Sequence, residues 1–238
     1  MSSKTEESTL VAMSGSPILR HADATPFTAP QASGCIEQIA NHIAAHLGQV
    51  ESVFHEIISD TVHIDVHIVK PNARCPGIRL VTSGMSDLPM STPQRVGAPQ
   101  YMELLATLPP AWHLDQESLQ DERWYWPIRL LKVLARLPHK YQTWLGFGHT
   151  VPNGDPCQPY APNTKLCGAI ILPSITVPAR FHRLRIDASK EISFFCVVPL
   201  YEEEMNLKLR LGSEALLKRL EKAKVNDLIE PARPNAAR

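Results

Sequence analysis

Alternation of apolar and polar residues predicts the strands of a β-sheet. Over residues 62–69, Ile64, Val66 and Ile68 fall on one face of a strand, and polar residues fall on the other. Residues 191–200 are apolar on both faces, which predicts a strand inside the sheet with packed layers on both sides. The remaining strands are predicted at residues 53–58, 78–82, 143–147, 166–172 and 181–186. Residues 63–69 and 79–82 are expected to pair antiparallel across a turn.

Apolar residues at spacings of three and four predict the helices. A first helix is predicted from an N-cap at Ser33 to residue 47, where Gly48 ends it. A short helix is predicted at residues 101–108, and a longer one, buried on most of its circumference, opens at Pro127. Two further helices follow Glu202, and a break at residues 212–213 divides them.

These elements alternate without a steady strand–helix–strand rhythm, and that mixture sets the fold class. We expect an α+β (mixed α/β) fold, with one twisted, largely antiparallel or mixed sheet packed with helices. Residues 1–32 lack periodicity and are interpreted as a flexible leader. Residues 33–228 form the domain, and residues 229–238 form a C-terminal tail that is expected to dock on its body.

Composition narrows the classes of function. The 24 basic and 24 acidic residues cancel, so no general attraction to nucleic acid or to a membrane surface is expected. No apolar run reaches the roughly 18 residues that a membrane-spanning helix needs. The number of cysteines, five, is odd, and no C-x-x-C motif occurs. A disulfide framework is therefore not expected, and a reducing, cytoplasmic location is favoured. We expect no cofactor, and the oligomeric state stays open.

Residues 78–90 form the most distinctive segment. A strand ends at Thr-Ser-Gly, where the glycine permits positive φ, and the following turn is rich in methionine. Such a turn either packs on the core or meets a partner. With a glycine-rich loop at residues 146–154, it supplies the predicted partner-binding residues: Thr82, Ser83, Gly84, Met85, Ser86, Asp87, Met90, Gly148 and His149.

Two arrangements could support chemistry. His63, Asp65 and His67 share one strand face and could bind zinc or iron, although a polar sheet face explains the same pattern without further ligands. Ser83 and His149 could act as nucleophile and base, but the serine lacks the first glycine of G-x-S-x-G. We therefore assign no catalytic residue and keep a metal-dependent hydrolase as an alternative.

Several segments together carry a resemblance to a known family. Residues 80–90, with the Thr-Ser-Gly-Met-Ser turn, resemble the signature of the suppressor of fused domain family. Residues 63–71, 144–156 and 194–205 resemble its other blocks in the same order, so the likeness covers most of residues 34–235. The resemblance implies that the block at residues 144–156 lies near the turn at residues 82–85.

The resemblance also implies a function. The animal protein joins this domain to a second one that clasps a transcription-factor peptide as an added strand, and this chain is expected to be too short for both. Bacterial single-domain members are thought to act as immunity proteins against polymorphic toxins. We therefore predict a non-enzymatic protein-binding domain that neutralises a toxin by occlusion. A regulatory module that binds a peptide at a sheet edge is a further alternative.

Overall fold

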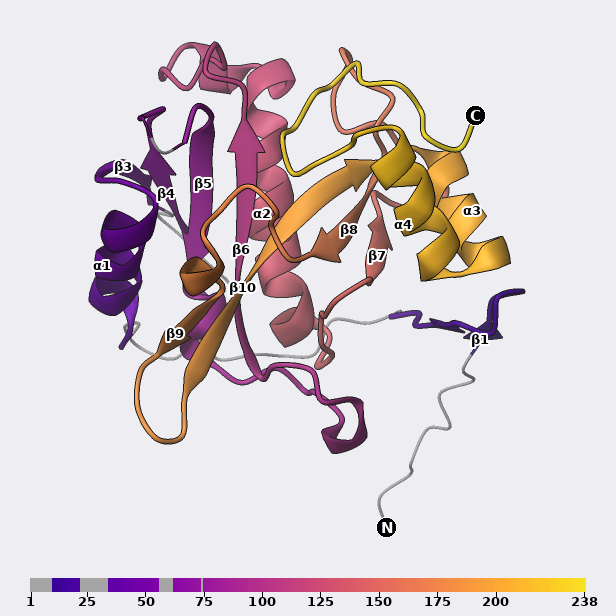
Figure 1. The fold of residues 1–238 in the computed structure, drawn as a ribbon, viewed down its shortest axis with the longest axis horizontal. Helices are drawn as coiled ribbons and strands as arrows, with labels where there is room; N and C mark the ends of the chain where they lie inside the picture. The colour runs from indigo at the N-terminus through magenta and orange to yellow at the C-terminus, as the bar shows by residue number, and fades with distance from the viewer. Residues whose placement is uncertain (1–9, 22–33, 56–61, 74) are drawn as a thin grey trace.

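The computed structural model describes residues 10–21, 34–55, 62–73 and 75–238, which build one large mixed sheet with helices on both faces (Figure 1). Seven strands follow one another in the order β3–β4–β5–β6–β10–β8–β7. β9 pairs with residues 191–193 at the start of β10, and β8 pairs with residues 196–200 at its end. Their bounds are β3 (Val50–Phe54), β4 (Asp65–Val69), β5 (Ile78–Ser83), β6 (Tyr101–Leu108), β7 (Thr150–Pro152), β8 (Gly168–Leu172), β9 (Arg183–Arg185) and β10 (Glu191–Leu200). The predicted fold class is confirmed.

Strand pairing is antiparallel except at the centre of the sheet. The predicted pairing of β4 with β5 is confirmed, with His67 opposite Val81. β6 and β10 are parallel, with Ile192 opposite Tyr101. The strand predicted at residues 143–147 does not form, because that segment is a connection whose backbone bonds to the loop after β5 through Ser91.

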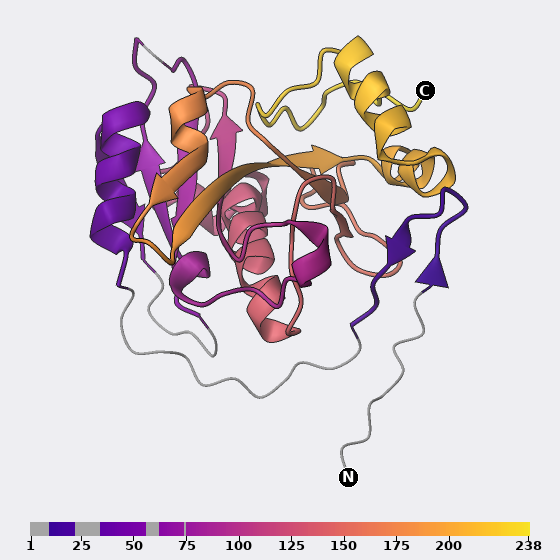
Figure 2. The ribbon, with the colours of Figure 1, turned by 60° about the horizontal axis from the view of Figure 1, so that its bottom comes forward.

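The described residues form four α-helices: α1 (Ile36–His46), α2 (Glu122–Lys140), α3 (Glu202–Leu211) and α4 (Ser213–Lys222). α1 and the short helix η4 (Ala179–His182) cover one face of the sheet, and α2 covers the other (Figure 2). β10 has apolar residues in both layers, as predicted, with Phe194 on the α1 side and Val197 on the α2 side. None of the helices in the described part of the chain is long and apolar enough to cross a membrane.

The helix starts differ from two predictions. α1 begins at Ile36 with Cys35 at its N-cap position, so the prediction of Ser33 as the N-cap is wrong. Ser33 itself lies outside the described residues, as do parts of the predicted leader and of the predicted strand at residues 53–58. α2 begins at Glu122, not at Pro127, because the Asp121 side chain caps the helix by accepting from the Arg123 backbone nitrogen. The break at residues 212–213 between α3 and α4 is confirmed.

The prediction of a helix at residues 101–108 is wrong, because this segment is β6 at the centre of the sheet. It pairs with β5 on one side and with β10 on the other. Met102 and Leu104 pack in the α2 layer, and Leu105 packs in the α1 layer. A strand buried on both faces has no polar face, so its apolar run matches helical spacing equally well.

Both terminal segments contact the body of the domain. Within the predicted leader, β1 (Leu10–Val11) and β2 (Pro17–Ile18) form a hairpin, and the Ser14 backbone nitrogen donates to the Leu209 carbonyl of α3. At the other end, Ile229 donates to the Thr107 carbonyl of β6. The Arg233 guanidinium forms two hydrogen bonds of 2.6 and 2.7 Å to the buried Glu204 carboxylate. The expectation that the C-terminal segment docks on the body is confirmed.

Candidate functional site

The turn after β5 depends on a glycine. Gly84 has φ +104°, and a Cβ placed there would lie 1.9 Å from the His63 carbonyl oxygen. The chain then enters the short helix η1 (Met85–Asp87). Only glycine tolerates both this conformation and this close approach. The turn backbone is therefore held directly against the segment that leads into β4.

A buried carboxylate of β6 organises this turn. The Glu103 side chain accepts from the Thr82 hydroxyl at 2.6 Å, and from the Ser86 hydroxyl and backbone nitrogen at 2.6 and 2.9 Å. The Thr82 hydroxyl in turn accepts from the Leu104 backbone nitrogen. Burial raises the pKa of Glu103 to about 7, although the hydrogen bonds from Ser86 and Thr82 oppose this rise. Nothing in the sequence had singled out this residue, because it lies within an apolar run.

The methionines of the turn pack on the core. Met85 is fully buried in the α2 layer, and its carbonyl oxygen lies 2.8 Å from Nε2 of His139 in α2. Met90 is also buried, and its sulfur accepts from the Leu145 backbone nitrogen at 3.5 Å. An apolar turn is expected either to pack on the core or to meet a partner. The side chains of Met85 and Met90 pack on the core.

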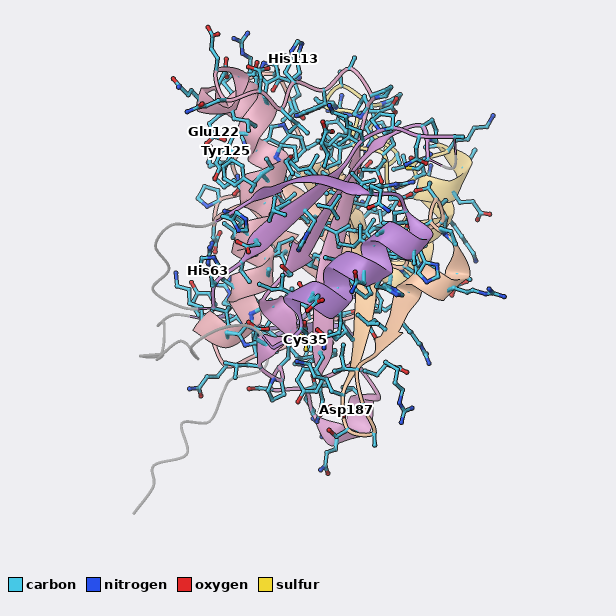
Figure 3. All side chains as sticks on the ribbon, turned by 90° about the vertical axis from the view of Figure 1, so that its left-hand side faces the viewer. Cys35, His63, His113, Glu122, Tyr125 and Asp187 are labelled. Atoms are coloured by element: carbon cyan, nitrogen blue, oxygen red, sulfur yellow. The ribbon has the colours of Figure 1, made fainter. Side chains whose placement is uncertain are left out.

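The histidines and the aspartate of β4 only partly come together. Asp65 lies between two histidines, with Oδ1 at 3.1 Å from Nε2 of His63 and Oδ2 at 3.0 Å from Nδ1 of His55. Figure 3 shows His63 at the margin of the molecule, on the α2 side. His67 instead contacts Ser83, with Nε2 2.9 Å from the serine hydroxyl. Within the described residues no group of three histidine, cysteine or acidic side chains is arranged to hold a metal ion, and the predicted set of His63, Asp65 and His67 is divided between two separate contacts.

The contact between Ser83 and His67 resembles a nucleophile–base pair but lacks two requirements for catalysis. Both residues are only 1% exposed, so a substrate does not reach them in this structure. The other ring nitrogen of His67, Nδ1, is buried and has no hydrogen-bond partner among the described residues, whereas a catalytic base is oriented by a third group. Burial also lowers the pKa of His67, although the Asp65 charge acts in the opposite direction.

Asp87 is the half-buried end of the turn. Burial raises the pKa of this carboxyl to about 6, while the charges of Lys190 and His63 act in the opposite direction. Its Oδ1 atom is buried and makes no hydrogen bond to the described part of the chain. Burial thus raises the pKa of two carboxyls at this turn, Asp87 within it and Glu103 beneath it on β6.

The second predicted loop leads into β7, the strand at one end of the sheet. The Lys208 ammonium of α3 donates to the Gly148 carbonyl at 2.6 Å and to the Thr150 hydroxyl at 3.1 Å. The His149 ring lies 4.2 Å from the Trp144 ring, and burial, aided by the Lys208 charge, lowers the pKa of His149 to about 4. Three strands separate β7 from β5, whereas the start of the loop contacts the segment after the turn through Leu145 and Met90, so its proximity to residues 82–85 stays a prediction. Ser83 contacts His67 and the His149 ring contacts Trp144, so Ser83 and His149 are not arranged as a nucleophile–base pair.

Comparison with known proteins decides the family. The family model of the suppressor of fused protein (SUFU) matches residues 60–234. The chain belongs to the suppressor of fused family. No curated protein matches it in a sequence search.

Solved structures agree with the suppressor of fused assignment at the level of the fold. A SUFU homolog of Neisseria gonorrhoeae superposes with a TM-score of 0.60 at 17% identity, covering 84% of this chain and 95% of the other. A chain of the Sufu–Fu complex gives a TM-score of 0.59 at 12% identity, covering 88% and 93%. Drosophila Suppressor of Fused gives 0.50 at 14% identity, covering 73% of this chain and 42% of that protein.

In this suppressor of fused domain, most of the predicted contact residues are internal. Asp87 and His149 are half-buried, and the following residues are buried: Thr82, Ser83, Gly84, Met85, Ser86, Met90 and Gly148. As the structure stands, these seven support the two loops from inside. The exposed side chains nearby belong to their neighbours, such as Pro89 and Phe147, which is 59% exposed.

Proposed function

We propose that this chain is a non-enzymatic protein-binding domain. The family match over residues 60–234 carries this proposal, because it covers most of the chain. The fold of the Sufu–Fu complex chain supports it, since that structure contains a suppressor of fused domain with a protein partner. The internal bonding of Ser83, His67 and Glu103 also favours a binding role over hydrolysis, because these groups already hold the turn.

The contact surface in this proposal consists of two touching loops, residues 88–100 and 141–149. Ser91 donates a backbone hydrogen bond of 3.0 Å to the Thr143 carbonyl, and the Met90 sulfur contacts the Leu145 nitrogen. Each loop exposes an apolar side chain, Val96 at 44% and Phe147 at 59%. The inner residues of both loops are buried and hydrogen-bonded, which holds the loops in place. Exposed apolar side chains on such loops are suited to anchor a partner.

The partner in this proposal is a toxin domain, and the chain neutralises it by occlusion, as a bacterial immunity protein. The shared fold of the Neisseria gonorrhoeae homolog, a bacterial protein, supports a bacterial role. A sheet packed on both faces is a stiff support for such a surface. A stable complex would bury on the order of 1,600 Å² in total, about 800 Å² from each protein.

Affinity capture from the cells that encode the chain tests this function. The tagged wild-type chain should retain one specific protein that a Phe147→Asp variant loses, and purified components should show at least a tenfold weaker Kd for the variant. Ile175→Asp is the matched control, because Ile175 is 78% exposed and adjoins Thr176, whose carbonyl accepts from Arg79 near the start of β5, whereas the first loop follows the end of that strand. Recovery of general chaperones alone, or equal loss with the control variant, would contradict the proposal.

A peptide bound at a sheet edge is the second candidate function. Among the described residues only β4 pairs with β3, so the outer edge of β3 is open to another strand. Hydrogen exchange with the captured partner distinguishes the two modes. Protection of the amides of residues 50–54 would favour strand addition, whereas protection of residues 88–100 and 141–149 would favour the loop surface.

A further inference from the structure

Two cysteines lie in direct contact at one end of the sheet. The sulfur atoms of Cys157 and Cys167 are 3.2 Å apart and share a hydrogen bond. Cys157 is half-exposed on the loop after β7, and Cys167 is buried directly before β8. All five cysteines of the chain are free thiols in this structure.

Backbone hydrogen bonds fix both positions. The Cys167 nitrogen donates to the Leu200 carbonyl at 2.9 Å, and its carbonyl accepts from the Asn153 nitrogen at 2.8 Å. The Asn153 side chain donates to the Gln158 carbonyl at 2.7 Å, and the Gln158 nitrogen returns a bond to the Asn153 carbonyl. To form a covalent bond, the sulfur atoms need to approach by only about 1.2 Å, a distance that side-chain rotation can supply.

A surface cavity of about 440 Å³ gives access to the pair. Both cysteines line it, together with cationic and anionic side chains: Lys165, Arg238, Glu202 and Glu203. Charges of both signs suit a small zwitterionic peptide disulfide of the glutathione type. Such a molecule can reach the half-exposed sulfur of Cys157.

We propose that Cys157 and Cys167 form a redox-active pair that closes to a disulfide by exchange with a small disulfide. The Cys157 thiolate attacks one sulfur of that molecule and releases a first small thiol, which leaves a mixed disulfide on Cys157. The Cys167 thiolate then attacks the Cys157 sulfur and releases the second small thiol. The two cysteines lose two electrons, the small disulfide gains them, and the two protons end on the released thiols.

The environments of the two sulfurs set this order. Burial raises the pKa of Cys167 to about 12, and the hydrogen bond and charge of Cys157 add to that rise. Cys167 is therefore a poor first nucleophile, whereas exposure favours attack by Cys157. Once Cys157 is in the mixed disulfide, its contribution to the raised pKa of Cys167 is removed, which favours the second step.

Closure would tie down a segment that contacts two other parts of the domain. Within it, the Tyr160 ring stacks on the Trp126 ring of α2 at 5.2 Å. The Thr164 hydroxyl donates to the Pro231 carbonyl of the C-terminal segment at 2.7 Å. Because the bond closes an eleven-residue loop (157–167), we expect Tm to rise by roughly 5–10 °C on oxidation.

The test uses the reduced full chain and oxidised glutathione, followed by thiol alkylation and mass spectrometry. The free thiols should fall from five to three. Tryptic cleavage at Lys165, which lies between the two cysteines, should release two peptides joined through Cys157 and Cys167. A Cys35→Ala control should still lose two thiols, whereas Cys157→Ser should form no internal disulfide.

Three results would overturn the proposal: five thiols that persist after treatment, a stable glutathione adduct on Cys157, or a linkage to another cysteine. The peptide map of the wild-type chain decides by itself if a variant fails to fold. The Tm measurement is a second readout, because the rise on oxidation should disappear in Cys157→Ala.

Discussion

Replacement of Glu103 by glutamine should remove a pH dependence of stability. The buried carboxyl has a pKa of about 7, against an ordinary value of 4.5. That difference corresponds to about 3 kcal/mol of preference for the protonated form in the folded state. Glutamine has nearly the same shape and stays neutral at every pH, so the substitution isolates the ionisation of this one group.

The sign of the effect follows from the raised pKa. Below pH 4.5 the Glu103 carboxyl is protonated in both the folded and the unfolded chain, so ionisation of this group takes nothing from the free energy of unfolding. Between pH 4.5 and about 7 only the unfolded state releases the proton, so stability falls as pH rises, and above that range the loss is constant. Glutamine keeps one acceptor oxygen for Ser86, but its amide nitrogen then faces Thr82 and cannot accept from the Thr82 hydroxyl, which costs about 1 kcal/mol. We therefore expect Glu103→Gln to be about 2 kcal/mol more stable than wild type at pH 8 and about 1 kcal/mol less stable at pH 4.5.

Urea unfolding of both proteins at pH 4.5, 6 and 8, followed by circular dichroism, measures this difference. Asp87 also has a raised pKa and contributes a slope of the same sign. Its charge adds to the raised pKa of Glu103, and because that interaction is mutual, Glu103→Gln should reduce the Asp87 slope as well and flatten the pH dependence further. Glu221→Gln on the exposed side of α4 is the control and should track the wild type. Equal pH slopes for Glu103→Gln and wild type would refute the reasoning.

Three further predictions concern the turn, the C-terminal segment and the second loop. Gly84→Ala should destabilise the domain by roughly 3 kcal/mol or more in urea unfolding, because its Cβ would collide with the His63 carbonyl at positive φ; a change below 1 kcal/mol would contradict this assignment. Arg233→Ala should cost about 3–5 kcal/mol because it leaves the buried Glu204 carboxylate unpaired, and a double variant with Glu204→Gln should recover part of that loss. His149 should stay neutral down to about pH 4 in an NMR titration, and a midpoint near pH 6.5 would show that the ring is not buried in solution.

The fold could be predicted where polar and apolar residues alternate or where a backbone break is visible. The alternation at residues 62–69 predicts β4, and Gly212 marks the break between α3 and α4. β6 could not be distinguished from a helix, because Leu104 and Leu105 are buried on opposite faces of the sheet. Its identity depends on pairing with β10, a contact between distant segments that no local pattern records.

The candidate site was predictable only in part, for a related reason. Gly84 was identified from its turn context, and its positive φ agrees with that interpretation. Glu103 and His55 could not be found, because each acts on a residue of a different strand. The partner of His67 likewise depends on the register between β4 and β5, which places Ser83 within reach.

The parallel pairing of β6 with β10 has a consequence for synthesis. Ile192 lies 91 positions after its partner Tyr101, whereas β3 to β6 each pair with neighbours in the sequence. A ribosome that adds 5–20 residues per second needs about 5–18 s to cover that distance. During this interval the edge of β6 that later pairs with β10 has unpaired backbone groups between apolar side chains. Such an exposed edge can pair with other chains and lead to aggregation. Production of this domain should therefore depend on chaperones that hold the first half until the second emerges.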